Sequence, residues 1–337
     1  MSANIKDVAE RAGVSIATVS HVLNGTRPTR QHTRQRVLTA VSELGYARNQ
    51  AARNLVRGRS SLLGLIISDI RNPFFPEITA AFQDQALAHD MDALVLNTNY
   101  DPRRTLNSVR RLMGLQVPGV AVLTSQIEPS VIAMLAGQRI AAVYLDLGRV
   151  APSIGNIVID YEKGIAQALE YLAGMGHKRI GYVGGPARLP SARRREKAFV
   201  EAAARLDMDA DRTIESDFTV KGGYFACSKL LACCNLTAIV AGNDLTAIGV
   251  LHRAYDSGKR VPEDLSVVGF DDILFAEYTQ PALTTVAVPR PEIGKVAFEA
   301  LWAMISDPDL AGREFRVEPR LVIRQSCQSL EEEESTV

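Results

Sequence analysis

Short apolar stretches alternate with amphipathic stretches of helical length through most of this 337-residue chain. Continuous apolar runs are typical of strands buried on both faces, and strand–helix alternation predicts an α/β fold with parallel, doubly wound sheets. We expect strands at 62–68, 92–98, 119–125, 141–146, 179–185, 237–244 and 265–272, and helices at 76–89, 164–175 and 245–255. This length of chain is enough for two subdomains.

Polar residues gather where these expected strands end. They occur in "SDIRNPFF" (68–75), at Asp146, in "GGPARLPSARRR" (184–195), at Asn243-Asp244 and at Asp271-Asp272. A single Asp after a strand is usually a helix cap or a turn residue. Ligands in doubly wound folds bind at the carboxyl ends of strands, however, and five loops on one rim indicate a ligand cleft.

The first 46 residues have a different pattern, that of a small helical bundle. Ile5, Val8, Ala9 and Ala12 form one apolar stripe, which Gly13 ends with a sharp turn. Ser15 is a good N-cap for a second helix. That helix is expected to bury Val19, Val22 and Leu23 and to expose Ile16, Ala17, Ser20 and His21. A third helix carries Val37, Leu38, Val41 and Leu44 on one face. This pattern is typical of a helix-turn-helix module.

The charge of the chain is unevenly distributed. Residues 1–60 contain ten Lys or Arg and three Asp or Glu, a net charge of +7, whereas the remainder carries −7 and the whole chain is neutral. A basic N-terminal segment on an acidic protein indicates a polyanionic partner such as DNA.

Several classes of protein are disfavoured. The sequence shows neither a signal-peptide pattern nor an apolar run long enough to span a membrane, so we expect a cytoplasmic protein without a membrane partner. The four cysteines lack zinc-site spacing, and no nucleotide-binding or hydrolase motif follows a strand. We therefore expect no metal, no cofactor and no enzymatic activity, and we interpret residues 330–337 as an acidic tail.

The stretches "IKDVAERAGVSIATVSHVLNG", "TRQRVLTAVSELGY" and "NQAARNL" resemble the lactose-repressor (LacI/GalR) family of bacterial transcription regulators. The resemblance implies a helix-turn-helix domain at 1–46 and a hinge helix at 47–60. It implies base reading by Ile16, Ala17 and His21, with Ser15, Thr18, Ser20 and Asn24 positioned on phosphates. In the hinge, Leu55 matches a minor-groove wedge, with Asn49, Ala52 and Arg53 in supporting contacts.

For residues 61–329 the resemblance implies a periplasmic-binding-protein-like body that binds an effector and dimerises. Its two subdomains are expected at 61–159 with 288–315, and at 160–287 with 316–329. By position, the effector pocket comprises Asn72, Phe74, Asp146, Ser191, Arg195, Phe218, Asn243 and Asp271. Hydroxyl-binding carboxylates and amides beside aromatic faces suit a sugar, polyol or nucleoside-like effector.

The expected mechanism is a population shift in a homodimer bound to a pseudo-palindromic double-stranded DNA operator. The effector could either release DNA or promote binding, and the tail lacks a heptad pattern for tetramerisation. Two alternatives remain open at this stage: a solute-uptake binding protein, and a sugar-metabolising α/β enzyme with a fused helical module, for which Asp271-Asp272 would be a carboxylate pair.

Overall fold

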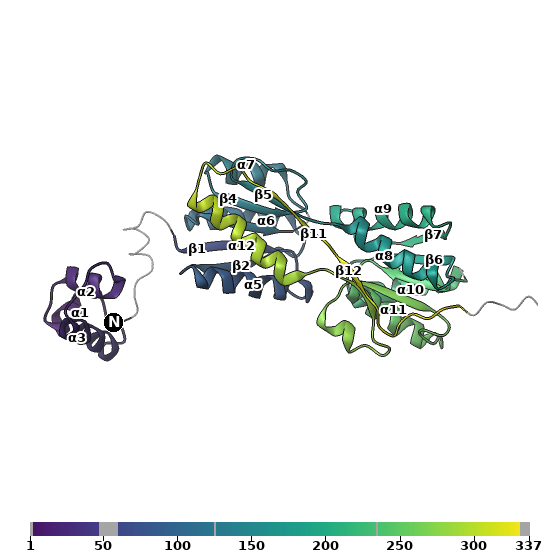
Figure 1. Cartoon of the computed structure of the whole chain (residues 1–337), viewed down its shortest axis with the longest axis horizontal. Helices are drawn as coiled ribbons and strands as arrows, with labels where there is room; N and C mark the ends of the chain where they lie inside the picture. Colours follow the sequence, from purple (N-terminus) through teal and green to yellow (C-terminus); the bar gives the residue numbers. More distant parts are fainter. Residues whose placement is uncertain (1–2, 47–59, 125, 234, 331–337) are drawn as a thin grey trace, which may run out of the picture. The chain divides into compact units, whose positions relative to one another are not determined.

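The computed structural model describes residues 3–46, 60–124, 126–233 and 235–330 (Figure 1). The chain divides into two compact units, Met1–Ser60 and Ser61–Val337, which we call the N-terminal unit and the body. None of the helices in the described ranges has the length and apolarity required to cross a membrane.

The N-terminal unit contains three helices, α1 (Ile5–Ala12), α2 (Ile16–Asn24) and α3 (Gln31–Glu43). Asn4 and Asp7 form a capping box at the start of α1, and Gly13 ends that helix in the left-handed conformation, with φ of 60°. Ser15 caps α2, since its hydroxyl accepts the Thr18 amide at 3.1 Å. The predicted helix–turn–helix arrangement of these residues is therefore present.

The core of the N-terminal unit is small and is made by all three helices. Its buried members are Val8, Ala9, Ala12, Val19, Val37 and Ala40, and Ile5, Val14, Val22, Leu23, Val41, Leu44 and Tyr46 pack against them. The prediction that Leu38 joins this core is wrong, because its side chain is 42% exposed. Ala40 takes the buried position instead, as its place on α3 faces the first two helices.

The first subdomain of the body contains a six-stranded sheet in the order β11-β5-β4-β3-β1-β2, with every pairing parallel. Its strands are β1 (Leu62–Ile67), β2 (Asp92–Asn97), β3 (Gly119–Leu123), β4 (Ala141–Leu145), β5 (Ile154–Ile159) and β11 (Glu314–Val317). Its helices are α5 (Phe74–Ala88), α6 (Pro102–Gly114), α7 (Pro129–Gly137) and α12 (Arg290–Ser306).

The second subdomain contains a sheet in the order β12-β10-β9-β8-β6-β7, in which only the β10–β12 pairing is antiparallel. Its strands are β6 (Arg179–Val183), β7 (Asp209–Ile214), β8 (Ala238–Ala241), β9 (Ser266–Asp271), β10 (Thr284–Ala287) and β12 (Arg320–Val322). Its helices are α8 (Tyr161–Gly174), α9 (Pro190–Arg205), α10 (Val220–Cys233) and α11 (Asp244–Asp256), followed by a 3-10 helix, η1 (Leu274–Glu277).

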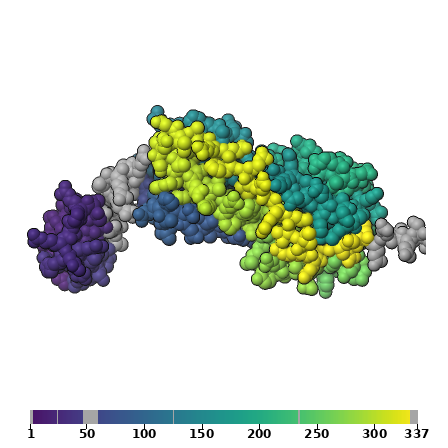
Figure 2. Space-filling view, in the orientation of Figure 1, coloured from purple at the N-terminus to yellow at the C-terminus, as the bar shows by residue number. Residues whose placement is uncertain are grey.

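Side-chain alternation along the strands builds a core on both faces of each sheet. In β1, for example, Leu65 and Ile67 belong to the core shared with α5 and α12, whereas Ile66 belongs to the core shared with α6 and α7. Because both faces are covered, the central strands are continuous apolar runs, as expected for doubly wound sheets. The space-filling view shows C-terminal residues, in yellow, running across both subdomains (Figure 2).

The predicted α/β class with two doubly wound sheets is confirmed, and the seven strands expected from the sequence are present with ends shifted by a few residues. The strands β5, β7, β10, β11 and β12 were not expected. The expected subdomain boundary between residues 315 and 316 falls inside β11, whose four residues all pair with β5 of the first sheet.

Candidate functional site

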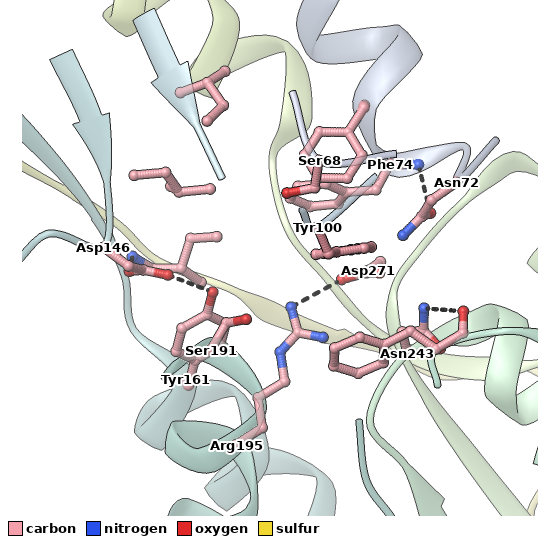
Figure 3. A pocket seen from close by; sticks show the side chains of 15 residues that line it. Ser68, Asn72, Phe74, Tyr100, Asp146, Tyr161, Ser191, Arg195, Asn243 and Asp271 are labelled. Carbon is pink, nitrogen blue, oxygen red and sulfur yellow. Dashed lines mark hydrogen bonds and ion pairs between the residues drawn. The ribbon is translucent and has the colours of Figure 1, made fainter. Parts of the chain in front are cut away.

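One pocket in the body lies where strands of both sheets end (Figure 3). The space among its lining atoms, with open solvent at the mouth included, is about 450 Å³. All eight positions named from the sequence line it. The lining residues are Ser68, Asn72, Phe74, Phe75, Tyr100, Leu123, Leu145, Asp146, Ile159, Tyr161, Ser191, Arg195, Phe218, Asn243 and Asp271.

Arg195 reaches from α9 into the middle of this pocket toward Asp271 (Figure 3). Its side chain is 8% exposed, and its Nη2 lies 3.4 Å from Asp271 Oδ1, while Nη1 donates to the Gly242 carbonyl. The guanidinium carbon lies 4.5 to 5.6 Å from the ring centres of three aromatic residues, Phe270, Tyr161 and Phe218. The negative faces of these rings stabilise the positive charge of the guanidinium. The Nε–H is buried and has no partner among the described residues.

Asp271 is the carboxylate that compensates this cation. Burial raises its pKa from 3.8 to about 6, against the opposing attraction of Arg195 and Arg290. The same attraction raises the pKa of Arg195, although burial alone would lower it. Arg290 also donates to the Asp271 carbonyl and to Glu77 of α5, at 3.1 Å. Arg290 thereby links a residue of the second subdomain with a helix of the first.

Asp146 follows β4 and interacts with the second subdomain. Its carboxylate accepts the Tyr161 hydroxyl at 2.6 Å, the Ile159 amide at 3.3 Å and Nη1 of Arg194 at 3.1 Å. Burial raises the pKa of Asp146, and the bond from Tyr161 and the charge of Arg194 oppose that rise. Few acceptor positions of this carboxylate remain free for a ligand.

The two asparagines of the pocket have structural bonds of their own. Asn72 accepts the Phe74 amide through its side chain at 3.0 Å. Asn243 caps α11 by accepting the Thr246 amide at 2.9 Å and also donates to the Phe218 carbonyl at 3.2 Å. Both side chains therefore hold the loops that bring other lining residues into place.

Aromatic rings form part of the pocket wall. Phe218 packs with Leu189 and Ala192 of the second subdomain, and Tyr100 of the first subdomain packs against this group. The Phe218 ring lies on the backbone of Gly185, where an added Cβ would come within 2.0 Å of a ring carbon. A side chain at position 185 would displace the ring, so glycine is required there.

Sequence reasoning missed several lining residues, among them Tyr100 and Tyr161. Tyr161 follows β5, a strand that was not expected, so nothing placed it at the rim. Tyr100 lies in the loop after β2 with φ of 57°, a conformation that aromatic residues rarely adopt and the sequence did not indicate. Arg194 also reaches the site, through Asp146.

In the N-terminal unit, α2 exposes two of the four side chains that were expected at its surface. Ile16 is 44% exposed, Ala17 is exposed, and Ser20 and His21 are half-buried. Ser15 and Thr18 share a hydrogen bond of 2.9 Å at the start of the helix, and His21 Nδ1 lies 2.8 Å from Thr26 Oγ1. Arg36 of α3 donates to the carbonyls of Ala12 and Gly13, so it stabilises the turn before α2.

Some predicted contacts fall outside what the structure describes. The hinge residues Asn49, Ala52, Arg53 and Leu55 belong to 47–59, and the acidic tail is undescribed from residue 331. Asn24 is the last residue of α2, but the structure does not describe its side chain. Within the described residues, no cluster of three or more His, Cys, Asp or Glu side chains could hold a metal ion.

Comparison with known proteins gives two family matches. Residues 4–49 match the model "Bacterial regulatory proteins, lacI family", and residues 169–327 match a periplasmic binding protein-like domain. The HTH-type transcriptional repressor PurR of Photobacterium profundum is 32% identical over 97% of this chain and 99% of its own. The chain belongs to the LacI family.

Solved structures agree with that assignment. A lac repressor dimer bound to operator and the anti-inducer ONPF is 26% identical, with a TM-score of 0.88, over 98% of this chain and 100% of its own. A CelR–cellobiose complex is 28% identical, with a TM-score of 0.73, over 96% and 99% of the two chains. This LacI-family member is a DNA-binding transcriptional repressor of the helix-turn-helix type, not an uptake protein or an enzyme.

Proposed function

We propose that this repressor binds a pseudo-palindromic operator as a homodimer, and that a small uncharged polar effector in the body pocket controls its affinity for DNA. The observation that carries this proposal is the convergence of eight residues, spread over 200 positions of sequence from Asn72 to Asp271, on a single pocket. Such convergence at strand ends is the usual arrangement of ligand sites in doubly wound folds.

The charges of the pocket favour an uncharged effector. Asp271 is compensated by Arg195 and Asp146 by Arg194, so a ligand with a net charge would enter a site whose own charges are already paired. The free Nε–H of Arg195 can donate to a ligand oxygen, and the rings of Tyr100 and Phe218 offer apolar faces. Sugars, polyols and nucleosides combine these features, and the cellobiose complex of CelR supports the sugar class.

Contacts across the pocket provide the means of control. Asp146 in the first subdomain bonds Tyr161 and Arg194 in the second, and Arg290 bonds both Glu77 and the Asp271 carbonyl. An effector inserted among these groups changes which relative position of the subdomains has the lowest free energy. It alters operator affinity only by as much as its own affinity differs between the two positions.

For the operator, we assign base contacts to Ile16, Ala17 and His21 on α2, and phosphate contacts to Ser15, Thr18, Ser20 and Asn24. The exposed apolar side chains of Ile16 and Ala17 suit a thymine methyl group. Asn49, Ala52, Arg53 and Leu55 stay assigned to the hinge contacts with the minor groove. Because the target is the bacterial chromosome, we infer that the protein acts in the cytoplasm, at the nucleoid.

A surface of the second subdomain suits dimerisation. Large apolar side chains are exposed on and beside α10, α11 and η1; they are Phe225, Tyr255, Leu274, Phe275 and Tyr278, each more than half exposed. Patches of this kind usually mark protein interfaces. A Tyr278→Glu variant should sediment as a monomer at concentrations where the parent is a dimer; an unchanged sedimentation coefficient would place the interface elsewhere.

The function is tested with the full-length protein in two steps. A thermal-shift screen of sugars, polyols and nucleosides identifies ligands, and operator sequences selected from random DNA then show whether those ligands alter DNA affinity. Arg195→Lys keeps the charge but loses the forked guanidinium, so it should weaken effector binding at least tenfold.

Arg193→Lys in the same helix is the matched control, because Arg193 is exposed and donates only to the Ala187 carbonyl among the described contacts. Equal effector affinity for the two variants would contradict the pocket assignment. A ligand that binds without changing operator affinity would contradict its regulatory role.

A further inference from the structure

The end of α2 brings a hydroxyl group back to its own reading face. Gly25 follows the helix with φ of 64°, in the left-handed region, and reverses the chain direction. Thr26 is the next residue, and its Oγ1 lies 2.8 Å from Nδ1 of His21. Thr26 is exposed and His21 is half-buried, so this bond lies at the surface and not in the core of the N-terminal unit.

A hydrogen bond at one imidazole nitrogen decides what the other nitrogen can do. When the threonine hydroxyl donates to Nδ1, the ring proton resides on Nε2. When the ring is a cation, Nδ1 donates to the hydroxyl and Nε2 again carries a proton. Only the neutral form with its proton on Nδ1 leaves Nε2 as an acceptor, and that form is the less stable one for imidazole side chains in water.

The same bond restricts the orientation of the ring. A histidine on a helix surface can rotate about two side-chain bonds, and a fixed partner at Nδ1 removes much of that freedom. Ala17, four residues earlier on α2, lies on the same helix face as His21 and belongs to the exposed reading surface. Nε2 has no partner among the described residues, so it is available to a ligand.

We propose that Thr26 is a positioning residue for operator recognition, which holds the His21 ring so that Nε2–H donates to an acceptor on a guanine edge. Guanine offers two such acceptors in the major groove, N7 and O6. This inference rests on the proposed base-reading role of His21. It assigns a specificity function to a residue that itself touches no base.

The test compares five full-length proteins: the parent, Thr26→Val, Thr26→Ser, His21→Ala and the double variant His21→Ala/Thr26→Val. Valine keeps the shape of threonine without the hydroxyl, whereas serine keeps the hydroxyl. Operators selected from random DNA, and competition between single-base variants at fixed salt, measure the preference at each position. Thr26→Val should reduce the guanine preference at one base pair per half-site by roughly two- to tenfold, the worth of one hydrogen bond. Thr26→Ser should retain it.

The double variant separates this inference from the one on which it depends. His21→Ala should abolish the same preference, and adding Thr26→Val should then have no further effect on it. If His21→Ala leaves the preference intact, the base-reading assignment of His21 fails and the role of Thr26 fails with it. If His21→Ala removes the preference but Thr26→Val does not reduce it, only the positioning role is overturned. Equal weakening of all sequences by Thr26→Val would make Thr26 a phosphate contact and would also overturn it.

Discussion

Replacing Asp271 by Asn should change how the stability of the body depends on pH. Burial raises the pKa of this carboxyl from 3.8 to about 6 in the folded protein, even though Arg195 and Arg290 oppose the rise. The folded state thus binds the proton more tightly than the unfolded state does. The resulting stabilisation is fully present below the unfolded pKa and is lost as the pH rises through about 6.

The magnitude follows from these two pKa values. Between pH 5 and pH 7.5, titration of Asp271 should remove about 1.4 kcal/mol from the free energy of unfolding. Asparagine has nearly the same shape and does not titrate. The free energy of unfolding of the parent minus that of Asp271→Asn should therefore fall by about 1.4 kcal/mol over this interval, since groups that do not interact with Asp271 cancel in the difference.

The measurement is urea unfolding at both pH values, followed by the fluorescence of Trp302. This is the only tryptophan of the chain and lies on α12, so its signal reports the body and not the N-terminal unit. Asp264→Asn is the matched control: the pKa of Asp264 is lowered by its bonds with Arg260, so it stays ionised throughout the interval. If the free energy of unfolding of the parent minus that of Asp271→Asn is the same at both pH values, as expected for Asp264→Asn, the burial argument is refuted.

Three further outcomes are expected. Arg194→Ala should tighten effector binding in calorimetry, because a ligand hydroxyl no longer competes with the guanidinium for Asp146, and should also destabilise the body, because the buried Asp146 carboxylate loses its opposite charge; weaker binding would contradict this. Operator affinity should fall by roughly 10³–10⁵ between 50 and 200 mM salt if a dimer contacts about 6–10 phosphates, and a flat response would exclude that contact set. Leu55→Ala should reduce specific affinity and DNA bending in a gel-mobility assay without lowering the melting temperature; a lower melting temperature with intact affinity would make Leu55 a core residue.

The sequence predicts a strand well where its buried residues are also apolar; β5 (IGNIVI) and β10 (TTVA) are equally buried but contain polar residues, and neither was expected. β1, β3, β4, β8 and β9 are buried on nearly every residue, so each one is a continuous apolar run. β7 is an edge strand with the sequence DADRTI and three exposed residues, so it carries no apolar pattern. β12 has three residues and is recognisable as a strand only from its pairing with β10.

The same distinction applies to the pocket. Asp146, Asn243 and Asp271 lie directly at the ends of predicted strands, so topology alone brings them together. The partners that decide their chemistry lie far away in sequence: Arg194 is 48 residues from Asp146, and Arg195 is 76 residues from Asp271. No local pattern encodes such pairs: the Arg194–Asp146 pair depends on how the two sheets are placed relative to each other, and the Arg195–Asp271 pair on how α9 packs within the second subdomain.

Backbone conformation gives an independent argument that this pocket is a functional site and not a packing gap. Four of its lining residues, Tyr100, Asp146, Phe218 and Asp271, have φ between 57° and 112°, where residues other than glycine are disfavoured. Such residues typically cost of order 1–3 kcal/mol each. These positions carry two carboxylates and two rings of the pocket, so the strain supports the ligand site proposed above.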